Sequence, residues 1–193
     1  MLITTNRRLL CATLLSLTAA SSGWSQAKRS VMSEIHVDYI APPSTIDEAV
    51  QTADVVVLGF VRGVRSYQPP LNTTVRMIYS VEVTAILRNH AAVTTPTLDV
   101  YRLGGQVDRG DYVENVVEAG FPNFVPGHQY VLFLTWNSAL TAFEVFRGPD
   151  GAFELLPDGT VDSASRSRFG QAQTAKLAGS LISDVKRAAA AVR

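Results

Sequence analysis

"TVRMIYSVEVTAILR" (residues 74–88) carries the most regular pattern in this chain of 193 residues. Apolar side chains occupy alternate positions on one face, namely Val75, Met77, Tyr79, Val81, Val83, Ala85 and Leu87. The intervening positions are mainly polar, with Ile78 and Ile86 as the exceptions. A period of two residues with one apolar face predicts a long, half-buried strand of an antiparallel sheet.

Further strands are predicted on both sides of this stretch. They are the runs rich in β-branched and aromatic residues at 54–64, 97–103, 129–136, 141–148 and 152–157. Short polar or glycine-containing turns separate the last three runs, which is typical of an antiparallel meander. Because a curved sheet hides its edges by closing, we predict a mainly β fold, a small closed or partly open antiparallel barrel of the OB-like type.

One helix is predicted at each end of this sheet. Thr45 and Glu48 have the spacing of a capping box, so a short helix is expected over residues 45–53. Near the C-terminus, apolar residues recur at helical spacing at Leu177, Leu181, Val185, Ala188 and Val192. This stripe predicts a long amphipathic helix within residues 166–193.

Residues 1–27 have the layout of a signal peptide. Arg7 and Arg8 precede a short apolar run, and small residues follow at Ser25 and Ala27. The run is shorter than the ~20 apolar residues that a membrane-spanning helix requires. We therefore expect export to the periplasm or the extracellular space, a lead-in segment at 28–43 and a barrel domain at 44–165.

Removal of a signal peptide changes the composition of the chain. The single cysteine, Cys11, is lost, so the mature protein has neither a disulfide nor a thiolate. Arg7 and Arg8 also go, and the 17 basic and 17 acidic residues become 15 and 17, a net charge of −2. No stretch concentrates lysine and arginine, which argues against binding to nucleic acid or to an anionic membrane.

The order of the predicted elements resembles a class of secreted bacterial barrels that are compared with the inhibitor domain of tissue inhibitors of metalloproteinases and with netrin modules. The resemblance covers about residues 44–160 and depends on Gly104-Gly105, on Pro126-Gly127 and on the run 148–151, Gly-Pro-Asp-Gly. It implies an OB-fold barrel. The animal inhibitors chelate the protease zinc through an N-terminal cysteine, which the mature chain lacks, so protease inhibition is an analogy of fold alone.

Residues 104–125 follow a predicted strand without continuing its pattern. Gly104, Gly105 and Pro122 interrupt the chain, and Tyr112, Val113, Val116 and Val117 suit a helical turn packed on the barrel. We expect the rest to be an exposed loop, and long loops are often functional. The predicted binding residues are Gly104, Gly105, Asp108, Arg109, Asp111 and Tyr112.

No catalytic or metal-binding constellation is apparent in the sequence. His36, His90 and His128 are isolated and lack zinc-ligand spacing, and no serine lies in a nucleophile elbow. The acids Asp108, Asp111, Glu114 and Glu118 are expected to face solvent, and Arg109-Gly110-Asp111 is expected to be an ordinary turn tip. No catalytic residue, metal ion or cofactor is therefore assigned.

Three hypotheses follow from the sequence. The first is a non-enzymatic exported binding module that contacts a protein or an envelope component through the 104–125 loop. The second is a small hydrolase in which Asp108, Asp111 and Glu114 converge with His128. The third is a structural envelope protein whose C-terminal helix docks onto a partner.

Overall fold

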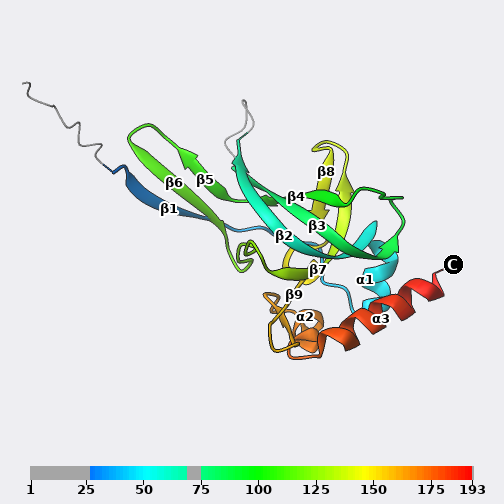
Figure 1. Ribbon diagram of the computed structural model, residues 1–193. Helices are drawn as coiled ribbons and strands as arrows, with labels where there is room; N and C mark the ends of the chain where they lie inside the picture. The colour runs from blue at the N-terminus through cyan, green and yellow to red at the C-terminus, as the bar shows by residue number, and fades with distance from the viewer. Residues whose placement is uncertain (1–26, 69–74, 193) are drawn as a thin grey trace, which may run out of the picture.

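The computed structural model of the protein describes residues 27–68 and 75–192, so nearly all of the predicted signal peptide lies outside the described residues. Within them the fold is mainly β, as predicted (Figure 1). The strands are β1 (Arg29–Ile35), β2 (Val55–Tyr67), β3 (Arg76–Asn89), β4 (Thr97–Leu103), β5 (Gly105–Asp108), β6 (Tyr112–Glu118), β7 (Gln129–Asn137), β8 (Ala142–Val145), β9 (Ala152–Leu155) and β10 (Val161–Ser163). The helices are α1 (Ile46–Thr52), α2 (Arg168–Gln173) and α3 (Ala178–Ala191), with a 3-10 turn, η1, at Gly148–Gly151.

The larger sheet has the strand order β10-β9-β7-β2-β3-β4-β8, and β8 also pairs with β7. The pairings of β7, β2, β3, β4 and β8 therefore return to their starting strand. The prediction of purely antiparallel strands is wrong, because β4 and β8 run parallel. A circuit of five strands contains an odd number of neighbours, so at least one pair in it must be parallel.

The smaller sheet has the order β1-β6-β5 and projects away from the rest of the molecule (Figure 1). Two predictions are wrong here. The lead-in segment 28–43 contains β1, which pairs in parallel with β6 from Arg29 opposite Tyr112 to Ile35 opposite Glu118. Residues 112–117 are not a helical turn but most of β6, the central strand of this sheet.

The predicted strand at 74–88 is confirmed over its described residues as β3, and its apolar face serves two hydrophobic clusters. A bulge opposite Leu58 and Gly59 leaves Thr84 without a register partner, and the Thr84 hydroxyl donates to the Leu58 carbonyl at 3.0 Å. Because a bulge shifts the alternation of side chains, Val83 and Ala85 pack against different clusters. Met77, Tyr79 and Val81 belong to the same cluster as Val83, which we call the inner cluster.

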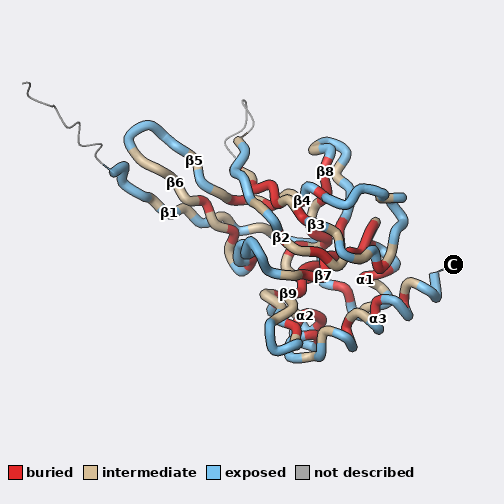
Figure 2. The backbone as a smooth tube through the Cα atoms, viewed as in Figure 1, coloured by how far each residue is buried: buried red, intermediate tan, exposed pale blue. Residues whose placement is uncertain are grey.

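The second cluster lies between the sheet and the helices, and we call it the helix-side cluster. In α1 the Thr45 side chain accepts from the Glu48 amide at 3.1 Å, which confirms the predicted cap. The apolar stripe of α3 is buried here through Leu181, Val185 and Ala188 (Figure 2). The predicted amphipathic C-terminal helix is present as α3, but it does not extend to α2, because residues 174–177 form a turn in which the Val161 amide donates to the Lys176 carbonyl.

Candidate functional site

The six residues predicted to bind a partner all lie in or beside the β5–β6 hairpin. They are Gly104, Gly105, Asp108, Arg109, Asp111 and Tyr112. Gly104 and Gly105 have positive φ angles of 99° and 125°, and a Cβ atom on Gly104 would lie 2.7 Å from the Val116 carbonyl oxygen. These two glycines therefore let the chain leave β4 and enter the projecting sheet at close range.

The hairpin turn at 109–111 is closed by its own side chains. The Asp108 carboxylate accepts from the Gly110 amide at 2.8 Å, and the Arg109 amide donates to the Tyr112 carbonyl at 2.9 Å. The Arg109 guanidinium folds back to bind the Glu114 carboxylate at 2.9 Å. The turn therefore engages its arginine within the hairpin, which agrees with the expected turn tip at Arg-Gly-Asp.

Side chains attach β1 to the hairpin in addition to the backbone pairing. Lys28 forms an ion pair with Asp108, Ser33 donates to Glu114 at 2.6 Å, and Asn115 donates to the Ser30 hydroxyl at 2.7 Å. The bond from Lys28 lowers the pKa of Asp108, and the bond from Ser33 lowers the pKa of Glu114. Both carboxylates are therefore ionised near neutral pH and hold β1 in place.

A buried ion pair lies where the projecting sheet joins the body, and the sequence analysis did not identify it. Glu118 was expected to face solvent, but its side chain and that of Arg102 are each 1% exposed, with 3.5 Å between Arg102 Nη2 and Glu118 Oε2. Arg102 also donates to the Phe121 and Pro122 carbonyls, each at 2.6 Å. In a strand, Glu118 lies two positions after the buried Val116 and therefore on the same face. The helical turn predicted for residues 112–117 did not reveal this relationship.

The aromatic residues that follow this pair pack into the inner cluster. Phe121 and Phe124 are buried in the inner cluster, and the Phe124 ring lies 4.9 Å from both the Tyr79 and the Tyr130 rings. The Arg102 guanidinium stacks 3.3 Å above the Phe121 ring. Burial lowers the pKa of Arg102, which means that the interior disfavours its charged form. The Phe121 ring and the Glu118 carboxylate offset this cost and stabilise the buried cation.

The acids of the hydrolase hypothesis do not converge with His128. The His128 ring instead lies 2.5 Å from Glu154, which also accepts from the Tyr130 hydroxyl at 3.2 Å. Burial raises the pKa of Tyr130 to about 12, so this phenol remains protonated. Among residues 27–68 and 75–192, no hydrogen bond or ion pair joins His128 to an acid of the hairpin, and no group of three potential metal ligands occurs.

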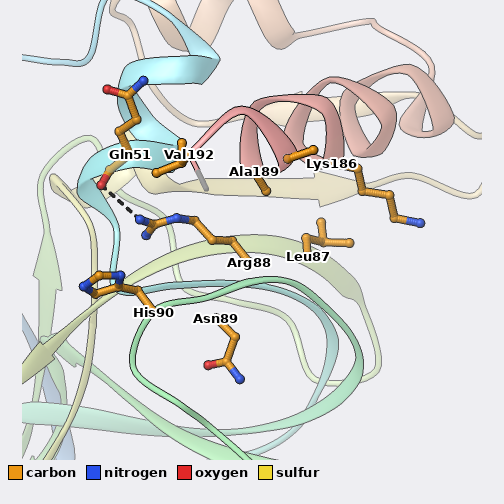
Figure 3. Close-up of a pocket in the computed structure, with 9 residues that line it drawn as sticks. Gln51, Leu87, Arg88, Asn89, His90, Lys186, Ala189 and Val192 are labelled. Atoms are coloured by element: carbon orange, nitrogen blue, oxygen red, sulfur yellow. Dashed lines mark hydrogen bonds between the residues drawn. The ribbon is translucent and has the colours of Figure 1, made fainter.

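A basic pocket of about 700 Å³ lies between α1, the end of β3 and the last turns of α3 (Figure 3). Arg88 donates to the Gln51 and Ala53 carbonyls at the C-terminal end of α1. The Lys186 side chain points away from Arg88, and His90 lies near the opposite wall (Figure 3). The cations do not converge, and Arg88 caps the C-terminal end of α1. We therefore interpret this pocket as a gap where α1, β3 and α3 meet, and not as a ligand site.

The third hypothesis required an apolar helix face that is free for a partner. Leu181 and Val185 are fully buried against the molecule's own helix-side cluster, so that face is occupied. No helix within the described ranges has the length and apolarity needed to cross a membrane. Comparison with protein-family models finds no family that matches the chain, and comparison with curated proteins finds no match.

Proposed function

We propose that the protein is an exported, non-enzymatic binding module whose body is an OB-like barrel. The five-strand circuit with its parallel β4–β8 pair supports the barrel, and the apolar plug of Phe121 and Phe124 supports its closure. The layout of residues 1–27 supports export. The resemblance to inhibitor and netrin barrels is part of the same proposal.

The observation that carries a binding function is the open edge of β1. In the described part of the chain β1 pairs only with β6, and nothing pairs with its other edge. The opposite end of this sheet is covered, since the Gln106 amide of β5 donates to the Ser66 hydroxyl of β2 at 2.8 Å. Unpaired backbone groups along an edge strand are a template for another strand.

The side chains of β1 favour a protein partner at this edge. Met32 is 76% exposed and lies in the middle of the strand, flanked by exposed Arg29 and Glu34. A partner segment in extended conformation would add its backbone hydrogen bonds to β1, and its side chains would contact Met32 and the flanking charges. The links from Lys28, Ser33 and Ser30 hold β1 extended before binding, which reduces the entropy lost on association.

Position-specific photo-crosslinking tests this proposal. A photoreactive phenylalanine analogue at Met32 is compared with the same analogue at Leu177, which is 63% exposed and immediately precedes α3. In envelope and culture fractions of the producing cell, the Met32 probe is expected to yield a discrete crosslinked protein and the Leu177 probe none. Hydrogen exchange of the complex is then expected to slow in β1. Equal crosslinking at both positions, or none at Met32, would refute the proposal.

A further inference from the structure

A second cleft, of about 670 Å³, lies at the end of the strand circuit, away from the projecting sheet. Its walls are the loop between β3 and β4 and the turn between β7 and β8. Trp136 lines the cleft, is 46% exposed, and packs edge-on against Phe143 with 5.0 Å between the ring centroids. We propose that this cleft binds a neutral saccharide, with Trp136 as the platform on which a sugar ring stacks.

The cleft is rigid in both walls. The Asn89 side chain bonds the backbone of Val93 twice, at 2.7 and 2.8 Å, and the Asn137 side chain accepts from the amides of Ala139 and Leu140. The backbone amide of Trp136 donates to Asp54 at 2.7 Å, which fixes the platform. Preformed, rigid walls are the usual property of a small-molecule site.

Two of the four described non-glycine residues with a positive φ line this cleft, one in each wall. Ala92 has a φ of 53° and Thr141 a φ of 49°, and both line the cleft. These residues are not glycine, so each left-handed conformation is energetically unfavourable and must be maintained by the fold. Both turns therefore keep a defined shape around Trp136 at an energetic cost, as recognition sites often do.

The polar groups of the cleft suit hydroxyl groups better than charges. The threonines in its lining are Thr94, Thr95, Thr97 and Thr141. Within the described part of the chain, no lysine, arginine or histidine lines the cleft, which disfavours phosphates and other anions. Its carboxylates, Asp54 and Asp99, are already engaged, the first by the Trp136 amide and the second by Arg65 at 2.9 Å.

In each of these carboxylates one oxygen accepts the hydrogen bond just described, and the other accepts none within the described ranges. Such an oxygen accepts a hydrogen bond from a sugar hydroxyl without needing a cation to neutralise it. A flat aromatic face next to two carboxylates and several threonine hydroxyls matches a sugar ring, which has an apolar C–H face and a polar rim. This inference is independent of the β1 edge.

Tryptophan fluorescence gives a direct readout, because the chain has only Trp24 and Trp136. In the full chain carrying Trp24→Phe, emission comes from Trp136 alone. Cellohexaose, chitohexaose, maltohexaose and mannohexaose are titrated separately, with a cationic chitosan hexasaccharide and a heparin hexasaccharide for comparison. At least one neutral probe is expected to shift the emission saturably below about 10 mM, as expected for weak single-site binding.

Variants measured by calorimetry assign the binding to this cleft. Trp136→Ala is expected to weaken binding about tenfold or more, which corresponds to 1.4 kcal/mol per factor of ten. Asp99→Asn is expected to weaken it several-fold, because it removes the carboxylate oxygen that accepts from the sugar. Tyr67→Ala removes an exposed aromatic residue elsewhere and serves as the control.

Three outcomes would overturn the inference. They are the failure of all four neutral probes, binding of the charged hexasaccharides alone, and neutral binding that survives Trp136→Ala. Because none of these experiments involves Met32, their failure would leave the proposal for the β1 edge standing, and the converse also holds.

Discussion

The Tyr39 hydroxyl donates a hydrogen bond to the buried carboxylate of Glu118, although the two residues are 79 positions apart in the chain. Burial and this bond raise the pKa of the phenol well above its usual value, so Tyr39 stays a donor at all physiological pH values. The contact ties the segment between β1 and α1 to the end of β6. The projecting sheet is thus anchored at both ends of its parallel pair.

Gly148→Ala is expected to break this anchor. Gly148 has a φ of 64°, and a Cβ atom there would overlap the Tyr39 ring. Gly159→Ala is the matched control, because Gly159 has a φ of 82° but open space around it. Both variants pay about 1–2 kcal/mol for the left-handed backbone. Chemical denaturation is expected to show that Gly148→Ala costs about 1–3 kcal/mol more, and equal losses would contradict the packing of Tyr39.

Arg102→Met is expected to destabilise the protein by about 3–5 kcal/mol, because it leaves the Glu118 carboxylate buried without its cation. The double variant Arg102→Met/Glu118→Leu should recover part of this loss, since no uncompensated charge remains. A double-mutant cycle from denaturant unfolding measures the coupling. Additive single losses would show that the two side chains do not act as a pair.

Acid is expected to release β1 before the body unfolds. Asp108 and Glu114 have lowered pKa values in the folded protein, so their contribution is complete above their unfolded pKa values, near 4, and is lost as pH falls through the lower folded values. Amide protection factors in β1 should therefore fall relative to those in β3 as the pH drops below about 4.

The variant Asp108→Asn/Glu114→Gln provides the control for this acid transition. It should show weak β1 protection already at neutral pH, with no further step in acid. A pH-independent β1 in the unmodified protein would contradict the role of the two carboxylates.

Gly59→Ala and Gly63→Ala form a second matched pair, both within β2. A Cβ atom on Gly59 would lie 2.7 Å from the Glu82 carbonyl oxygen and 2.8 Å from a Val81 methyl group, whereas Gly63 has open space. Thermal unfolding should show a loss of about 1–3 kcal/mol for Gly59→Ala and a change within about 0.5 kcal/mol for Gly63→Ala. Similar values for the two would mean that β2 and β3 are less closely packed at the bulge.

Leu181→Ala tests whether the C-terminal helix belongs to the body. Leu181 is fully buried, and its truncation is expected to cost about 2–5 kcal/mol in denaturant unfolding. Leu177→Ala, at an exposed position four residues earlier, should change stability by less than about 0.5 kcal/mol. A small effect of Leu181→Ala would reopen the helix face to a partner.

Local signals predicted the elements whose partners are close in the sequence. The cap of α1 and the alternation in β3 both depend on residues a few positions apart, and both were correct. β1 was missed because its strand character depends on β6, whose Tyr112 lies opposite Arg29. In β6 itself, the spacing of the valines fits a helix face as well as a strand, and their β-branched side chains were the better guide.

The candidate sites were predictable only in part. The segment 104–125 was identified as a candidate interaction surface from its glycines and charged residues, but it was expected to be a loop with a helical turn and not the hairpin of β5 and β6. The Arg102–Glu118 pair, the closure of the circuit by β8 and the cleft at Trp136 all depend on contacts between distant segments. The break between α2 and α3 also depends on a distant contact, because the Lys176 carbonyl accepts a hydrogen bond from the Val161 amide instead of from a later residue of a helix.

The bulge at Thr84 governs how the molecule comes apart on heating. The same strand, β3, supplies Val83 to the inner cluster and Ala85 to the helix-side cluster. Neither cluster can therefore unfold while the other remains intact. The body should therefore unfold in one cooperative transition. β1, β5 and β6 contribute no residue to either cluster. The projecting sheet that they form can therefore open locally, at a lower free energy than global unfolding, while the body stays folded.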